Sequence, residues 1–166
     1  NLQWFNEDLQ KALLVLLGNG DIKNEGVTLQ NNNVNVKPFI FWPRNPQIYE
    51  DFLNKNERKK YNERNNETIF IGNIENNVQD KFRNNNINWD NVISDYHITN
   101  GTKHKFTQQE YLNKMSNSKF GLTLRGYGLK CHREVELMGL GTIPIITPDV
   151  NIDSYLDPPI ENIHYI

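Results

Sequence analysis

Short, dense apolar runs alternate with longer amphipathic stretches along most of this chain. A short apolar run rich in β-branched and aromatic residues is typical of a strand buried on both faces. The stretches between the runs repeat apolar positions every three or four residues, which indicates helices. This alternation predicts an α/β fold with a doubly wound, Rossmann-like parallel sheet. The predicted buried strands are Pro38–Trp42, Thr68–Ile71, Phe120–Leu124 and Ile143–Thr147.

Helices are predicted before and between these strands, each from one apolar stripe and its end signals. The first covers residues 6–17, with Asn6 as its cap and Gly18 as its stop. The others are Gln47–Asn65 with Ile48, Phe52 and Leu53 inside, Asn77–Arg83, a helix capped by Thr107 that packs Tyr111, Leu112 and Met115, and a charged helix after Gly128 that carries Lys130, Arg133 and Glu136. Weaker strand signals cover Val27–Leu29, Trp89–Ile93, Tyr96–Ile98 and His164–Ile166.

The stretch from residue 18 to residue 37 is rich in glycine and asparagine and predicts a polar linker. We therefore expect residues 1–37 to form an N-terminal helix with its linker, and residues 38–166 to form the Rossmann-like domain. The chain starts at Asn1 without a methionine. We expect a processed protein or a fragment.

Composition excludes several function classes. The net charge is −2 with the basic residues spread out, so no nucleic-acid-binding stripe is predicted. The longest apolar run, Ala12–Leu17, is far too short to span a bilayer. The single cysteine, Cys131, forms no disulfide framework and favours a reducing compartment such as the cytoplasm or the interior of a host cell.

The segment Arg125-Gly126-Tyr127-Gly128 lies where the strand Phe120–Leu124 gives way to a helix. Parallel sheets bind their ligands at this edge, and glycines there let the backbone approach a phosphate. Arg125 and Lys130 could add positive charge opposite a diphosphate leaving group. The alternative is a turn without a ligand, and on this motif alone the two interpretations are about equally supported.

Arg133 and Glu136 are three residues apart and share one face of the predicted helix. A carboxylate there can accept both hydroxyls of a ribose, whereas the alternative is a solvated ion pair with little energetic weight. Gly72-Asn73 and Thr147 end two other predicted strands and could line the same crevice, or only terminate those strands.

No metal-ligand spacing and no Ser-His-Asp or Cys-His arrangement can be argued from the sequence, and no catalytic residue is assigned. His132 lies beside the candidate site, whereas His97, His104 and His164 are interpreted as structural.

The segment from residue 118 to residue 146 resembles the exostosin-like glycosyltransferases of the GT-B fold, in their C-terminal, donor-binding half. The resemblance rests on Ser118-Lys119-Phe120-Gly121-Leu122, Arg125-Gly126-Tyr127-Gly128, Arg133-Glu134-Val135-Glu136 and Gly141-Thr142-Ile143-Pro144-Ile145-Ile146. Ile69-Phe70-Ile71-Gly72-Asn73 is similar to the earlier strand and glycine turn of that half.

The resemblance implies an enzyme that transfers a sugar from a nucleotide-sugar, with UDP as the expected nucleotide, to a glycan acceptor without a metal. Glu136 would bind the ribose, and Arg125 with Lys130 would face the diphosphate. A complete GT-B enzyme has two Rossmann-like domains, so the resemblance also implies a missing N-terminal domain that supplies the catalytic base. Two alternatives remain open: a non-catalytic nucleotide- or glycan-binding module of a larger assembly, and a fucosyltransferase-like GT-B enzyme.

Overall fold

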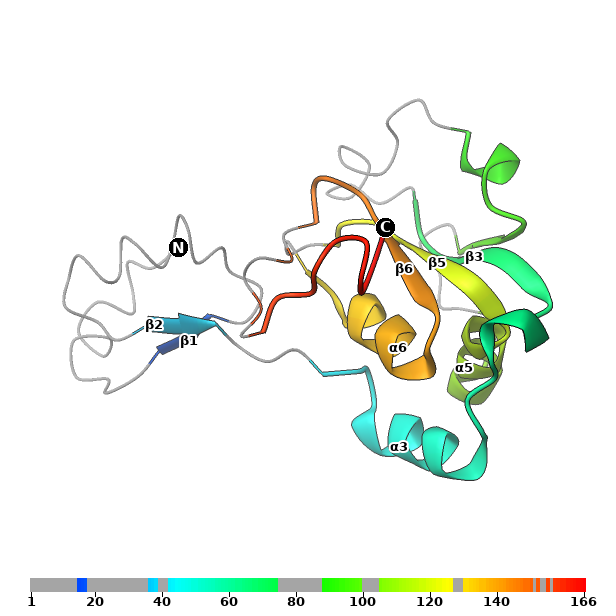
Figure 1. Cartoon of the computed structure of the whole chain (residues 1–166), viewed down its shortest axis with the longest axis horizontal. Coiled ribbons are helices and arrows are strands. Elements are labelled where there is room, and N and C mark those ends of the chain that lie inside the picture. The colour runs from blue at the N-terminus through cyan, green and yellow to red at the C-terminus, as the bar shows by residue number, and fades with distance from the viewer. Residues whose placement is uncertain are drawn as a thin grey trace.

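The computed structural model describes residues 15–17, 36–38, 42–74, 88–99, 105–126, 130–150, 152, 155 and 157–166. Within these ranges, four parallel strands form the main sheet in the order β4-β3-β5-β6 (Figure 1). Their register pairs Ile69 with both Asp95 and Gly121, and Gly121 with Pro144. The α/β class with an all-parallel sheet is therefore confirmed. The strands are β3 Asn66–Gly72, β4 Asp95–Ile98, β5 Ser118–Thr123 and β6 Ile143–Ile146.

The strand order reverses between β3 and β5. The next strand in the chain after β3 is β4, which pairs on one side of it, whereas β5 pairs on the other side and β6 continues outward from β5. In an open parallel sheet, the connections on the two sides of such a reversal leave on opposite faces and open a crevice at the carboxyl ends of the strands. This rule predicts a crevice where β3 and β5 end.

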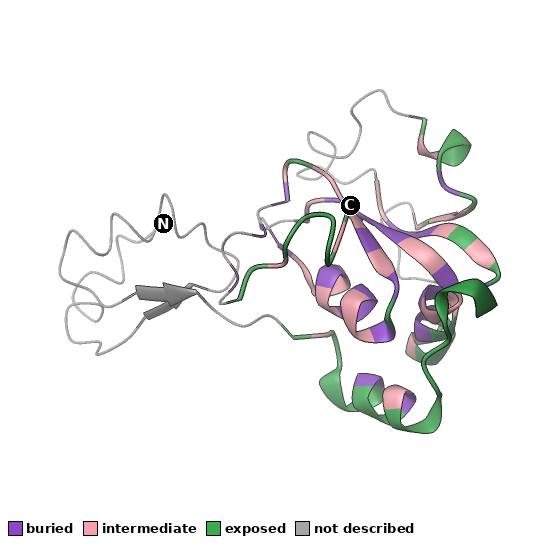
Figure 2. Ribbon diagram, in the orientation of Figure 1, coloured by how far each residue is buried: buried purple, intermediate pink, exposed green. Residues whose placement is uncertain are grey.

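Helices of the described part of the chain cover one face of the sheet: α3 (Pro46–Lys55), α5 (Gln108–Ser116) and α6 (His132–Leu140). Their buried positions are purple in Figure 2. The core on this face contains Ile69 and Ile71 of β3. The residues that the helices bring to it are Tyr49, Phe52, Tyr111, Leu112, Met115, Leu137 and Leu140. The opposite face buries a second cluster, which consists of Phe70, Ile93, Leu122 and Leu124.

Arg64 ties the amino ends of the strands together. The residue is 5% exposed, and its guanidinium donates to the carbonyls of Ser118 at the start of β5, Leu140 at the end of α6, and Lys59. It also donates to Thr142 Oγ1 at 2.7 Å, just before β6. Each N–H group of the guanidinium thus has an acceptor, and hydrogen bonds from one side chain hold the amino edge of the sheet.

Several predicted elements agree with the structure. The strands at Thr68–Ile71, Tyr96–Ile98, Phe120–Leu124 and Ile143–Thr147 correspond to β3, β4, β5 and β6, with ends displaced by two residues at most. The Thr107 cap is also confirmed, because its hydroxyl accepts the amide of Glu110 while the Glu110 carboxylate accepts the amide of Thr107. This reciprocal capping box is a local sequence signal.

The predicted helix over residues 6–17 is wrong at its last three residues. They form β1 (Val15–Leu17), which pairs in parallel with β2 (Val36–Pro38), and residues 6–14 lie outside the described ranges. Consecutive apolar residues fit a helix and a strand equally well, so pairing with a distant segment decides between them. Of the predicted strand Pro38–Trp42, residues 39–41 lie outside the described ranges. Its first residue is the last of β2, and Trp42 lies outside any strand and is 50% exposed.

The predicted helix Gln47–Asn65 ends at Lys55, because the Asn56 backbone is extended and its side chain bonds the Phe52 carbonyl. Tyr49 rather than Ile48 faces the core, and Ile48 is 43% exposed. The predicted strand Trp89–Ile93 is wrong, since Trp89–Asn91 form a 3-10 turn. Asp90 and Asn91 favour such turns.

Residues 164–166 do not form the predicted strand. Ile166 alone bonds the edge of β6: its amide donates to the Pro144 carbonyl, and its carbonyl accepts the Ile146 amide. Tyr165 forms an isolated bridge with Glu161. The predicted elements Val27–Leu29 and Asn77–Arg83 lie outside the described residues. The domain boundary after residue 37 stays a prediction.

We expect Arg64→Lys to lower the free energy of unfolding by about 2–4 kcal/mol, because an ammonium cannot serve all the acceptors that the guanidinium serves. Chemical denaturation measures the change. The matched control is Arg58→Lys at an exposed position, which should stay within about 0.5 kcal/mol. Equal stability of the two variants would show that the Arg64 hydrogen bonds do not hold the amino edge.

Candidate functional site

The carboxyl ends of β3 and β5 would border the crevice that the strand order predicts. β3 ends at Gly72, and beyond β5 the chain continues through buried Leu124 to half-buried Arg125 and buried Gly126. The strand-end placement of Gly72, Arg125 and Gly126 agrees with the sequence prediction. Two further predicted site residues, Tyr127 and Gly128, lie outside the described residues.

Gly72 leaves room for the end of the Arg133 side chain. A Cβ atom built on Gly72 would lie 2.7 Å from Arg133 Nη2, closer than real Cβ contacts come. Arg133 comes from the first turn of α6 and donates from Nη2 to the Ile71 carbonyl at 2.6 Å. Its guanidinium also stacks on the Phe70 ring, 4.8 Å from the ring centre. The side chain therefore crosses the end of β3, from the helix face of the sheet toward the opposite face.

The Arg133 guanidinium interacts with the Tyr111 hydroxyl, and two of its nitrogen atoms find no further acceptor among the described residues. Nε and Nη1 are buried and make no hydrogen bond within the part of the chain that the structure describes. Leaving a buried charged donor unsatisfied costs on the order of 1–3 kcal/mol. Positive charge with unused donors at a strand-end crevice is the chemistry that a phosphate oxygen satisfies.

Glu136 is engaged inside the protein. It is 3% exposed, its Oε2 accepts the Tyr111 hydroxyl at 2.8 Å, and its Oε1 accepts the Arg44 amide at 2.9 Å. The expected alternative of a solvated ion pair is therefore wrong, because the folded helix turns this carboxylate inward. Of the two carboxylate oxygens, Oε1 is the one that the exposed Arg44 backbone covers.

Two tyrosine hydroxyls lie close to Glu136. Its backbone carbonyl accepts the Tyr49 hydroxyl at 2.9 Å, and burial together with the Glu136 charge raises the pKa of Tyr49 to about 12. Burial and the same charge raise the pKa of Tyr111, while the Arg133 guanidinium acts in the opposite direction. Both hydroxyls thus stay protonated at neutral pH and serve as donors. The Tyr111 hydroxyl lies close to both the Glu136 carboxylate and the Arg133 guanidinium, and each charge shifts its pKa.

Lys130 precedes α6 instead of lying on it, because the helix begins at His132 rather than directly after Gly128. This corrects the sequence prediction. The residue is 1% exposed, and its Nζ lies 4.9 Å from the centre of the Tyr155 ring. Burial lowers the pKa of Lys130 below its ordinary value. The cation is thus held close to the crevice edge by an aromatic ring rather than extended into solvent.

Glu134 caps the first turn of α6. Its Oε2 accepts the Cys131 amide at 2.7 Å, and its Oε1 accepts the Cys131 thiol at 3.2 Å. Burial raises the pKa of Glu134 above that of an ordinary carboxyl group. A phosphate at this edge would therefore depend on arginine and lysine side chains more than on the Cys131 amide.

Thr147 and Asn73 flank the crevice at the ends of β6 and β3. The Thr147 hydroxyl bonds the Thr123 carbonyl at 3.2 Å, and Asn73 is half-buried. Asp149 follows two residues beyond Thr147, in the turn that closes the last strand at the same sheet edge. Its Oδ2 is buried and accepts no hydrogen bond within the described ranges. No sequence signal separates this aspartate from an ordinary turn residue.

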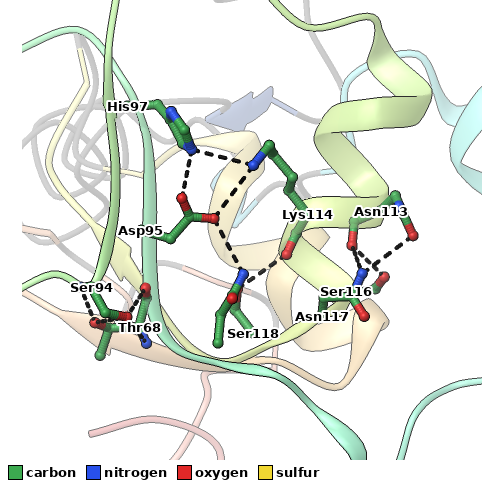
Figure 3. Close-up of polar contacts among 10 residues, drawn as sticks. Thr68, Ser94, Asp95, His97, Asn113, Lys114, Ser116, Asn117 and Ser118 are labelled. Carbon is green, nitrogen blue, oxygen red and sulfur yellow. Dashed lines mark hydrogen bonds and ion pairs between the residues drawn. The ribbon is translucent and has the colours of Figure 1, made fainter.

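A second polar cluster joins β4 to α5 (Figure 3). Asp95 Oδ1 lies 2.7 Å from His97 Nε2, and Asp95 Oδ2 lies 3.6 Å from Lys114 Nζ. The His97 ring packs edge-on against Phe106. These contacts agree with the structural interpretation of His97, which clamps the edge strand to the helix beside it.

A pocket of about 100 Å³ lies where α3, α5 and α6 end, away from the crevice. Leu53 and Leu140 contribute apolar walls, and Arg58 and Lys59 contribute charge. None of the predicted site residues lines it.

Across the described residues, no group of three or more His, Cys, Asp or Glu side chains could hold a metal ion. No helix in the described ranges combines the length and the apolar character needed to cross a bilayer.

Comparisons with known proteins found no match among protein-family models, curated proteins or solved structures.

We expect Gly72→Ala to lower the free energy of unfolding by about 1–3 kcal/mol, because the added methyl group collides with Arg133 Nη2. Chemical denaturation measures this change. Glu67→Ala in the same strand is the control, since it removes only an ion pair with Lys119 at the surface, and such pairs contribute little to stability. A fully stable Gly72→Ala variant would contradict the crossing of Arg133 over the end of β3.

We expect the Cys131 thiol to react slowly in the folded protein. Burial raises its pKa to about 12, so the nucleophilic thiolate is scarce at pH 8. Alkylation by iodoacetamide at pH 8 should be at least about 100-fold slower in the folded chain than in denaturant. Equal rates in the two states, in a chain shown to be folded, would contradict the raised pKa of this thiol.

Proposed function

We propose that this chain is the donor-binding part of an exostosin-like glycosyltransferase, which transfers a sugar from a nucleotide-sugar to a glycan acceptor. The observation that carries the proposal is the reversal of strand order between β3 and β5, with Gly72, Arg125 and Gly126 at the strand ends beside it. Doubly wound sheets bind nucleotides at such a position. The resemblance of the segment from residue 118 to residue 146 supports the assignment to sugar transfer.

The diphosphate would lie at the ends of β3 and β5. Arg133 would offer N–H groups of Nε and Nη1 there, and Arg125 and Lys130 would add positive charge. When the bond between the sugar and the diphosphate breaks, negative charge develops on the leaving phosphate, and fixed cations stabilise it. We propose that these side chains do this without a metal ion.

The nucleoside would extend from the diphosphate toward α6, where Glu136 would accept the ribose hydroxyls. Asn73 and Thr147 would border the bound ligand at the two neighbouring strand ends. We propose UDP as the nucleotide and a separate N-terminal domain as the source of the catalytic base.

A second candidate function is a non-catalytic nucleotide- or glycan-binding module of a larger assembly. The cations at the strand ends support it equally, because Arg133 and Lys130 can bind a phosphate without any transfer. This candidate predicts binding without turnover even when the missing domain is supplied.

We expect UDP or GDP to bind the chain without a divalent metal, and Arg125→Ala to weaken that binding about tenfold, which corresponds to about 1.4 kcal/mol. Isothermal titration calorimetry measures both affinities. Arg58→Ala, at the distant pocket, is the matched control and should bind as the wild type does. Absence of binding by a demonstrably folded chain would contradict the proposed function.

A further inference from the structure

The residues from Trp42 to Asn45, called the 42–45 segment, lie across α6 and join it at two points. The Arg44 amide donates to Glu136 Oε1 at 2.9 Å, and His132 Nδ1 donates to the Trp42 carbonyl at 2.5 Å. Both contacts use the backbone of the segment, and both lie within the first two turns of α6. The segment thus binds the same helix surface that the proposed function gives to the nucleoside.

The side chains of the segment are largely turned to the surface. Trp42 is 50% exposed, and Arg44 and Asn45 are exposed as well. Asn45 adopts a left-handed conformation with φ of 51°, which an asparagine tolerates better than most residues do. Pro46 then starts α3. The segment thus lies on the surface of α6, outside the buried core cluster, and ends at a turn next to α3.

The two oxygens of Glu136 differ in how they are held. Oε2 accepts the Tyr111 hydroxyl from within the core, since Tyr111 is 7% exposed. Oε1 accepts the amide of the exposed Arg44. Release of the segment would therefore free Oε1 while Tyr111 keeps the carboxylate in place, and a ribose hydroxyl could then donate to Oε1.

We propose that the 42–45 segment is an autoinhibitory strap, which occupies the ribose position on Glu136 and is displaced when a nucleotide binds. The inference rests on the proposed function and adds a regulation of that same site. The Arg44 amide and the ribose hydroxyl compete for one oxygen, so each must weaken the binding of the other.

The test removes a single N–H group. Arg44→Pro has no amide hydrogen and cannot bond Glu136, whereas Arg44→Ala loses the side chain but keeps the amide. UDP and GDP are titrated into both variants, the wild type and Glu136→Ala. We expect Arg44→Pro to bind nucleotide about tenfold more tightly than Arg44→Ala does. Equal or weaker binding by a folded Arg44→Pro variant would overturn the inference.

Amide hydrogen exchange on the wild-type chain provides a second measurement. It tests the inference even when the Arg44→Pro variant does not fold. Bound nucleotide should make the Arg44 amide exchange faster, because its acceptor is lost. Unchanged or slower exchange would show that the segment and the ligand coexist, which overturns the inference. If nucleotide binds but Glu136→Ala binds it equally well, the inference fails while the proposed function stands. If neither nucleotide binds any of these proteins, the proposed function fails and the inference fails with it.

Discussion

The buried carboxylate of Glu136 is the point at which several parts of the structure meet. It lies on α6, accepts a hydroxyl from α5 through Tyr111, and accepts an amide from the segment before α3 through Arg44. The neighbouring Glu136 carbonyl accepts the hydroxyl of Tyr49 on α3. A buried charge is tolerated only when such partners surround it, because its desolvation is costly. Hydrogen bonds to one residue therefore join α5, α3 and the segment before α3 to α6, in addition to the apolar core between the helices.

An arginine lies at each edge of the sheet, and the two guanidinium groups differ in how completely the protein bonds them. Arg64 at the amino edge has an acceptor for each of its N–H groups, all of them supplied by the protein. Arg133 at the carboxyl edge donates to the Ile71 carbonyl, and its buried Nε and Nη1 atoms have no acceptor within the described residues. The same kind of side chain therefore serves as a fully bonded structural tie at one edge and is less completely bonded, among the described residues, at the other. This difference is one reason for our proposal that an anionic ligand binds at the carboxyl edge.

Sequence reasoning succeeded where local signals are strong and failed where contacts join distant residues. The apolar run before Arg125 and the capping box at Thr107 each identify an element without reference to the rest of the chain, and the rules for parallel sheets then place the strand ends. No periodicity shows that Val15–Leu17 pair with another strand, or that Arg133 crosses the end of β3. The bond from the Arg44 amide to α6 spans 92 positions, and no local pattern encodes it.

The most direct test of the central claim is a map of backbone amide chemical shifts during titration with UDP. If the crevice at the strand-order reversal is the binding site, the largest changes will cluster at Gly72, Gly126 and Arg133. Changes centred on the pocket near Arg58 and Lys59 would contradict the claim, and so would a folded chain whose spectrum UDP leaves unchanged.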